Sequence, residues 1–129
     1  MSIRFLTLAE VFEIHEDQIR RYGGESGIRD ADLLDSAVNM PQSTFDGNML
    51  HEDIFEMAAA YLFHLVQNHS FVDGNKRVGT MAAYVFLFLN GYNLEMSQDD
   101  LVQMVLAVAS GKLKKHDIAS FLRTHVSSE

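Results

Sequence analysis

The stretch of sequence that decides the fold class lies at residues 81–89. It reads Met81-Ala82-Ala83-Tyr84-Val85-Phe86-Leu87-Phe88-Leu89. Because this segment is apolar on every side, it is typical of a helix that other helices surround in the interior of a soluble protein. The helix should begin near Gly74 and end at Asn90-Gly91, a pair that commonly stops helices. We therefore expect a central buried helix with the remaining elements packed around it.

Five other segments show helical periodicity or helix-start signals. They cover residues 7–22, 30–39, 52–68, 97–110 and 115–126. The first opens with a capping box, in which Thr7 and Glu10 can satisfy each other's backbone N–H groups. Pro41 should close the second, because its ring cannot continue a helix and biases Met40 out of the helical region.

Little of the chain is left for strands. Residues 42–51 are expected to form a loop, and Tyr92-Asn93-Leu94 is at most a short extended piece. The sequence therefore predicts an all-α fold, a compact single-domain bundle of about six helices that spans residues 1–129.

The composition excludes several classes of function. The 129 residues include 10 Lys+Arg against 18 Asp+Glu, a formal net charge of -8, and no Cys. Without cysteine, a disulfide framework, a zinc–thiolate site and a thiol nucleophile are excluded. An acidic chain offers no broad surface for polyanions, so we expect no direct nucleic-acid binding and no membrane partner. The first residues show no secretory signal, and a cytoplasmic location is expected.

The residues that carry chemistry lie just before the apolar stretch. They read His69-Ser70-Phe71-Val72-Asp73-Gly74-Asn75-Lys76-Arg77. This segment joins the end of one helix to the start of the next. The backbone N–H groups of Gly74, Asn75 and Lys76 should therefore point out of the positive end of a helix, which favours phosphate binding. Gly74 lets the backbone approach a ligand closely, while Lys76 and Arg77 add two cations at the same place.

His69 and Asp73 are the candidate catalytic residues of this segment. His69 lies at the negative end of the preceding helix, which stabilises an imidazolium and suits a base that accepts a proton. Two roles stay open for Asp73: it can hold a divalent ion shared with phosphate oxygens, or cap the helix through the N–H groups of Asn75 or Lys76. Phe71 is interpreted as a buried core side chain that fixes the loop. Asn75 should hold the loop by side-chain to backbone hydrogen bonds, with a phosphate contact as the second possibility.

The same nine residues resemble the signature of the Fic/Doc family. That signature runs His, any, Phe, any, Asp or Glu, Gly, Asn, Gly or Lys, then Arg, and every fixed position is filled here. The resemblance to the Doc (death on curing) toxin branch extends to residues 15–19, to Arg21-Tyr22-Gly23-Gly24, to Gly27-Ile28-Arg29-Asp30 and to the total length. It implies a compact all-α bundle, in agreement with the helical pattern.

The resemblance also implies an activity. Members of the family transfer a phosphate-containing group from a nucleotide to a protein hydroxyl, here with His69 as base and with Asp73 holding Mg²⁺. Gly74, Asn75, Lys76 and Arg77 would bind ATP. The Doc branch carries Lys where AMP-transferring members carry Gly, phosphorylates translation elongation factor Tu, and is silenced by a small antitoxin protein bound in trans. The implied function is that of a kinase-like toxin in a toxin–antitoxin pair.

Two alternatives are an AMP transferase of the Fic type and a catalytically silent antitoxin-binding module. AMP-transferring relatives usually have a second Arg three residues after the first, where this chain has Thr80. That departure favours transfer of the γ-phosphoryl group. The intact His69, Asp73, Asn75 and Arg77 argue against a silent module. No Glu is followed by Gly or Asn, so the self-inhibitory pattern of many Fic proteins is missing and control should come from a separate chain.

The remaining histidines and lysines are interpreted as structural. His64 and His69 are five residues apart, which is off the spacing for two metal ligands on one helix face. The other four histidines have no visible partners: His15, His51, His116 and His125. The basic run of Lys112, Lys114 and Lys115 is expected to be a solvated linker.

Overall fold

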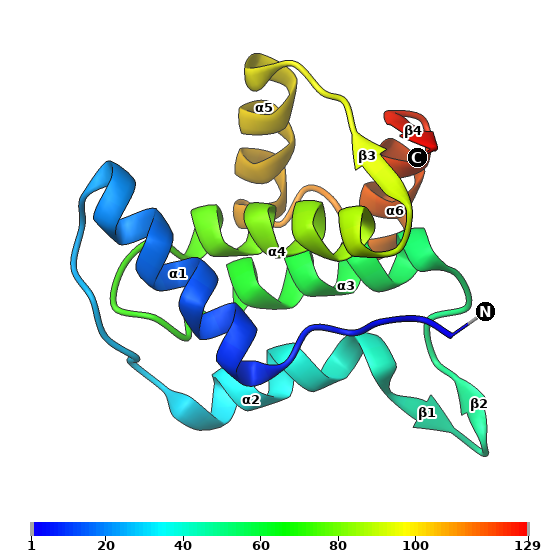
Figure 1. The fold of residues 1–129 in the computed structure, drawn as a ribbon, viewed down its shortest axis with the longest axis horizontal. Helices are drawn as coiled ribbons and strands as arrows, with labels where there is room; N and C mark the ends of the chain where they lie inside the picture. Colours follow the sequence, from blue (N-terminus) through cyan, green and yellow to red (C-terminus); the bar gives the residue numbers. More distant parts are fainter. Residues whose placement is uncertain (1, 129) are drawn as a thin grey trace.

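The computed structural model describes residues 2–128, and within that range the chain forms six α-helices, one 3₁₀ turn and four short strands (Figure 1). The helices are α1 Leu8–Tyr22, α2 Ala31–Asn39, α3 Ile54–Gln67, α4 Asn75–Leu89, α5 Gln98–Ala109 and α6 Lys115–Arg123. The 3₁₀ turn η1 is Met40–Gln42, and the strands are β1 Thr44–Phe45, β2 Asn48–Met49, β3 Tyr92–Leu94 and β4 Val126–Ser128. The predicted all-α class is confirmed.

Side-chain caps set the start of several helices, as the sequence indicated. The capping box of α1 is present: the Glu10 N–H donates to Thr7 Oγ1 at 3.1 Å, and the Thr7 N–H donates to Glu10 Oε1 at 2.9 Å. Asp30, Asp53 and Ser97 cap α2, α3 and α5 in the same way, each accepting the N–H group of the residue three positions later. These caps satisfy donors that a helix leaves free, so short polar residues decide where each helix begins.

The centre of the fold is the antiparallel pair α3 and α4, which Figure 1 shows side by side across the middle of the molecule. α3 also contacts α2, α5, α6 and η1. Gly79 lets the two helices approach closely, because a Cβ there would lie 2.8 Å from Val66 Cγ2 and 3.1 Å from the Leu62 carbonyl oxygen. The pair therefore brings the end of α3 and the start of α4 together at one end of the molecule.

The position of the central helix differs from the expectation. In α3, residues 57–62 are all buried, so this helix is enclosed on every side. In α4, Tyr84, Phe88 and Leu89 are exposed, because α1, α3 and α5 leave part of that helix open to solvent. The apolar stretch at 81–89 thus belongs to a core helix with one free face, and α3 occupies the centre.

Two predictions about the segment after α2 are wrong. Met40 keeps helical angles (φ −56°, ψ −42°), because Pro41 enters at the start of the η1 turn, where its missing N–H group is not needed. The expected loop at 42–51 contains the β1–β2 hairpin. Its turn is Asp46-Gly47, with φ of 51° and 79°, a dipeptide suited to the positive φ angles of a tight hairpin.

The expected helix over residues 115–126 is too long. α6 ends at Arg123, and β4 pairs antiparallel with β3, so that Val126 lies opposite Leu94. Both of these side chains pack against the core, which favours an extended strand over another helical turn. The short extended piece expected at Tyr92-Asn93-Leu94 is confirmed as β3.

A cluster of three basic side chains ties α6 to α3. Lys115 Nζ lies 3.1 Å from Nε2 of His51 and 3.1 Å from Nε2 of His64. Lys115 is half-buried, so it is not part of a solvated linker, and His51 has a partner. Burial, with the nearby Lys115 charge, lowers the pKa of His64 to about 4 and also lowers the pKa of His51. The cluster is therefore built for neutral imidazoles that accept hydrogen bonds from Lys115.

We predict that His64 makes the fold sensitive to acid. Its folded pKa, about 4, lies below the unfolded value of 6.5, so protons bind the unfolded chain first and stability falls as pH drops through this window. In His64→Gln, an amide that cannot titrate can still accept from Lys115. Thermal melts at about pH 7 and about pH 4.5 should show a smaller acid-induced loss of Tm for this variant than for wild type.

The matched control is His116→Gln, since His116 is exposed on α6. Its melting curves should keep the acid sensitivity of wild type. An equal loss of Tm in His64→Gln and wild type would contradict the prediction.

Candidate active site

The loop between α3 and α4 begins with a strained residue. Asn68 ends α3 with helical angles, and His69 then takes φ of 49°, a left-handed conformation that is uncommon outside glycine. Arg29 holds this turn: Nε donates to the His69 carbonyl at 2.6 Å and Nη2 to the Asn68 carbonyl at 3.1 Å. One arginine from outside the motif therefore caps the end of α3 and fixes the backbone of the candidate base.

The segment that links α1 to α2, residues 23–30, runs along the loop and is called the strap. Its main chain pairs with the main chain of the loop. The N–H groups of Arg29 and Asp30 donate to the Ser70 carbonyl at 2.7 and 3.0 Å, and the Val72 N–H donates to the Gly27 carbonyl at 3.0 Å. The loop is thus held along its length by a segment about forty residues away in the sequence.

Phe71 and Asn75 fix the loop from the inside, as predicted. Phe71 is 1% exposed. Asn75 Oδ1 accepts from the Phe71 N–H and Asn75 Nδ2 donates to the Phe71 carbonyl, both at 3.0 Å. The Asn75 amide is therefore engaged in the loop, which leaves its backbone N–H group for a ligand. His15, for which no partner was expected, stacks on the Phe71 ring.

Asp73 holds its carboxylate at the surface of the loop. Oδ1 accepts from the Gly74 N–H at 2.8 Å, and Oδ2 accepts from the Glu25 N–H at 3.2 Å. These two hydrogen bonds are the main cause of a lowered Asp73 pKa, so the group is ionised at neutral pH. The alternative, in which Asp73 caps the N–H groups of Asn75 or Lys76, is wrong. Gly74 (φ 77°) takes the N-cap position, and the Asp73 carboxylate binds the N–H groups of Gly74 and Glu25 instead.

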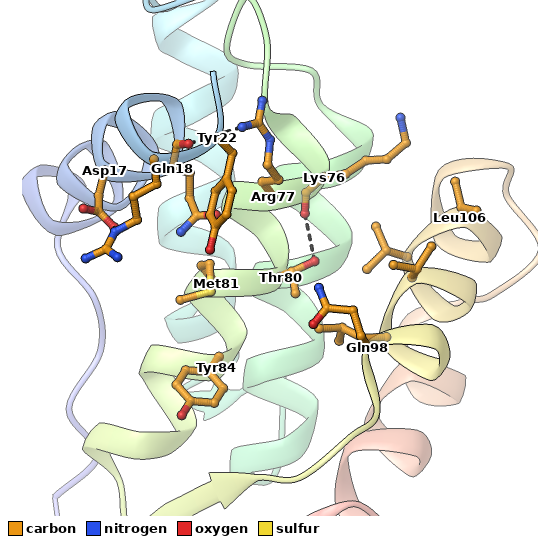
Figure 2. Close-up of a pocket in the computed structure, with 14 residues that line it drawn as sticks. Asp17, Gln18, Tyr22, Lys76, Arg77, Thr80, Met81, Tyr84, Gln98 and Leu106 are labelled. Atoms are coloured by element: carbon orange, nitrogen blue, oxygen red, sulfur yellow. Dashed lines mark hydrogen bonds and ion pairs between the residues drawn. The ribbon is translucent and has the colours of Figure 1, made fainter. Parts of the chain in front are cut away.

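Lys76 and Arg77 point in different directions (Figure 2). Arg77 Nη1 donates to the Gln18 carbonyl at 3.2 Å and to the Gly23 carbonyl at 2.9 Å, at the end of α1. Lys76 is exposed and extends on the side of α5. Both cations border the same pocket, but one edge of the Arg77 guanidinium donates to backbone carbonyls. The Thr80 hydroxyl donates to the Lys76 carbonyl at 2.8 Å.

The structure brings every predicted site residue to one pocket. The pocket has a volume of about 450 Å³ and is lined by His69, Asp73, Gly74, Asn75, Lys76 and Arg77, with Val66, Val72 and Ala109 completing the wall. A histidine, a carboxylate, a helix N-terminus and a lysine therefore line the same space. This arrangement can bind a phosphorylated ligand and remove a proton from a hydroxyl beside it.

A larger groove of about 710 Å³ adjoins this pocket and shares Lys76 and Arg77 with it. It lies between α1, α4 and α5, and Figure 2 shows the side chains that line it. Most of the exposed surface in it is apolar, and Met81, Leu101 and Val105 contribute to it.

Sequence reasoning missed Arg29, Gly24 and His15 as parts of the site. All three fell inside stretches noted only for their family resemblance, 15–19, 21–24 and 27–30, and no local pattern indicated their contacts with the loop. Among residues 2–128, no helix is long and apolar enough to cross a membrane.

Comparisons with known proteins agree with this geometry. A family model described as Fic/DOC family matches residues 5–87. The protein named Toxin Doc of Mycolicibacterium smegmatis is 45% identical over 78 residues, which cover 60% of this chain and 60% of that protein's length. The protein named Protein kinase doc of Escherichia phage P1 is 28% identical over 121 residues, which cover 94% of each.

We predict that Gly24→Ala disturbs Asp73. A Cβ at this position would lie 2.7 Å from Asp73 Oδ2 and 3.0 Å from Arg77 Nη2, and the φ of 112° is unfavourable for any L side chain. The neighbouring Gly23 (φ 85°) has open space around a new Cβ, so Gly23→Ala is the matched control. Each alanine should lose about 1–3 kcal/mol of unfolding free energy to backbone strain, and Gly24→Ala should lose clearly more. Equal losses in denaturant titrations would contradict the close contact.

Proposed function

The chain belongs to the Fic/DOC family, and from that premise we propose that it is a Doc-type toxin that transfers the γ-phosphoryl group of ATP to a hydroxyl of a bacterial protein. The proposed acceptor is translation elongation factor Tu in the cytoplasm, as the family resemblance implies. The observation that carries the proposal is the single pocket shared by His69, Asp73 and the first turn of α4. The names of the two relatives, a toxin and a protein kinase, support it.

The start of α4 supports phosphate binding because no side chain within the described range caps it. Side chains cap α1, α2, α3 and α5, whereas the first-turn N–H groups of α4, at Asn75 and Lys76, have no such cap. The Gly74 N–H, expected to join them, instead donates to Asp73 Oδ1. Free donors at the positive end of a helix stabilise an anion. The side chain that would block them is absent at position 74, and Lys76 adds a positive charge at the rim of the pocket.

Asp73 fits a role in holding Mg²⁺. Each of its oxygens accepts one backbone hydrogen bond and keeps lone-pair capacity for a metal. Within residues 2–128, no group of three His, Cys, Asp or Glu side chains gathers to hold a metal. A single exposed carboxylate suits Mg²⁺, which takes one or two protein carboxylates and completes its shell with phosphate oxygens and water.

His69 is the proposed base. It lines the pocket with its side chain exposed, while Arg29 holds its carbonyl and therefore the direction from which the ring enters the site. The imidazole would take the proton of the acceptor hydroxyl as its oxygen attacks, and the α4 N–H groups with Lys76 would orient the phosphoryl oxygens. When bound, ATP supplies the phosphoryl group, and Mg²⁺ neutralises charge on the departing phosphates.

The distribution of cations supports transfer of the γ-phosphoryl group over AMP transfer. One turn below Lys76 on α4, position 80 is Thr, and its hydroxyl donates to the Lys76 carbonyl, so α4 places no cation at that position. Arg77 is held by the end of α1. Lys76 therefore supplies positive charge at the mouth of the helix, where the terminal phosphate of ATP is expected to rest beside His69. An AMP transferase remains the second candidate function.

The apolar groove between α1, α4 and α5 is the proposed docking site for an antitoxin bound in trans. Its size suits a helix of a partner laid against Met81, Leu101 and Val105. Because Lys76 and Arg77 border both the groove and the catalytic pocket, a partner seated there would lie next to the nucleotide. This placement would let a separate chain control a site that lacks a self-inhibitory segment.

We predict that label from γ-labelled ATP, and not from α-labelled ATP, is transferred to purified elongation factor Tu in the presence of Mg²⁺. The added protein mass should match one phosphate. His69→Ala is the control, and its rate should fall by a factor on the order of 10²–10⁴ with an unchanged melting temperature. Transfer from the α position, or a mass increase matching AMP, would replace the proposal by the AMP-transferase alternative.

We also predict that expression of the wild-type chain arrests bacterial growth, because an unrestrained transferase acts on an abundant protein. Growth should continue when His69→Ala is expressed at the same level, and co-expression of the antitoxin should restore growth in the wild-type culture. Harmless accumulation of soluble wild-type protein would favour the silent antitoxin-binding module.

A further inference from the structure

His15, a buried residue of α1, contacts the loop between α3 and α4. His15 is 0% exposed, and its ring stacks on Phe71 with centroids 3.7 Å apart and planes 8° from parallel. Its Nε2 atom lies 2.6 Å from the carbonyl oxygen of Asp73. His15 lines neither of the two pockets, so it has no direct contact with a ligand in them. The mechanism proposed above gives this residue no role.

The contacts of His15 define which ring nitrogen carries the hydrogen. A carbonyl oxygen only accepts hydrogen bonds, so Nε2 must be the donor to Asp73. Nδ1 is buried and has no hydrogen-bond partner among residues 2–128. The Glu16 carboxylate, 3.8 Å from Nδ1, is beyond hydrogen-bond distance. Nε2 therefore carries a hydrogen and directs it at the loop.

This hydrogen bond fixes a peptide plane that also reaches the Asp73 carboxylate. The Asp73–Gly74 peptide is trans, so its C=O and N–H groups point in opposite directions. The C=O group points inward to His15, and the Gly74 N–H points back to Asp73 Oδ1 at 2.8 Å. A glycine at position 74 would otherwise leave this plane free to rotate, because glycine accepts many backbone conformations.

We propose that His15 is a positioning residue for the reaction: by anchoring the Asp73 carbonyl, it sets the peptide plane whose N–H group orients the Asp73 carboxylate. The inference rests on the proposed function, in which that carboxylate holds Mg²⁺. The carboxylate is then held through two routes, from α1 through the peptide and from the strap through the Glu25 N–H. Loss of the first route lets the Asp73–Gly74 peptide rotate.

Three variants separate the hydrogen bond from the packing. His15→Phe keeps a ring against Phe71 and removes the donor, whereas His15→Gln removes the ring and places an amide donor near the position of Nε2. Tyr61→Phe is the matched control. The Tyr61 hydroxyl accepts a buried hydrogen bond from the Leu6 N–H at 2.8 Å, and neither residue belongs to the α3–α4 loop. It removes a buried side-chain to backbone bond of the same kind away from the loop.

The first readout uses the protein without ligand. In ¹⁵N-resolved NMR spectra, the Gly74 and Glu25 amide signals report the two hydrogen bonds to the Asp73 carboxylate. His15→Phe should shift the Gly74 signal strongly, His15→Gln should return it toward the wild-type position, and Tyr61→Phe should leave it in place. The ring nitrogen shifts of wild-type His15 should show a hydrogen on Nε2.

The second readout is the Mg²⁺ dependence of transfer. In His15→Phe, kcat or the apparent Mg²⁺ affinity should fall by about 10–100-fold, as is typical when a partner behind a metal ligand is lost. His15→Gln should recover most of this loss. Tyr61→Phe should lower Tm and leave both quantities at the wild-type value, which separates positioning from stability.

An unchanged Gly74 signal in His15→Phe would overturn the inference. So would equal losses of rate in His15→Phe and His15→Gln, or a wild-type ring without hydrogen on Nε2. The wild-type ring measurement decides the matter if a variant fails to fold. A wild-type protein without transferase activity would contradict the proposed function alone, because the NMR readouts need no reaction.

Discussion

The close antiparallel contact of α3 with α4 is the constraint on which the rest of the structure depends. It places the carbonyl end of one helix beside the N–H end of the other, with a loop of a few residues between them. The end of α3 and the start of α4 differ in whether a side chain binds their backbone groups. Arg29 satisfies the carbonyls that end α3, whereas the start of α4 carries no side-chain cap in the described part of the chain. This asymmetry gives the helix–loop–helix connection a pocket with His69 on one side and the uncapped start of α4 on the other.

Contacts on two sides hold the loop of the site. The strap fixes the outer side of the loop through its main chain, and His15, Phe71 and Asn75 fix the inner side. Phe71 and Asn75 belong to the motif, whereas the strap and His15 lie outside it. The predicted site residues are therefore local in sequence, and part of what holds them in place is not.

This division explains what the sequence could predict. Helix starts were recognisable because a cap and its donor lie three residues apart, as at Thr7 and Ser97. The pocket residues were recognisable because nine consecutive positions carry them. The contact of His15 spans 58 residues, and those of Lys115 span 64 and 51, so no local pattern signals them. The end of α6 was missed for the same reason, because pairing with β3 decides it.

The uncapped first turn of α4 also links ligand concentration to the survival of the folded chain. In the protein without ligand, water must accept the hydrogen bonds of these N–H groups. An anion bound there meets its donors only in the folded state, since the unfolded chain does not gather them at one point. By mass action, such an anion shifts the folding equilibrium toward the native protein and lowers the fraction open to proteolysis. If the proposed nucleotide binds there, its concentration would therefore influence the lifetime of the protein.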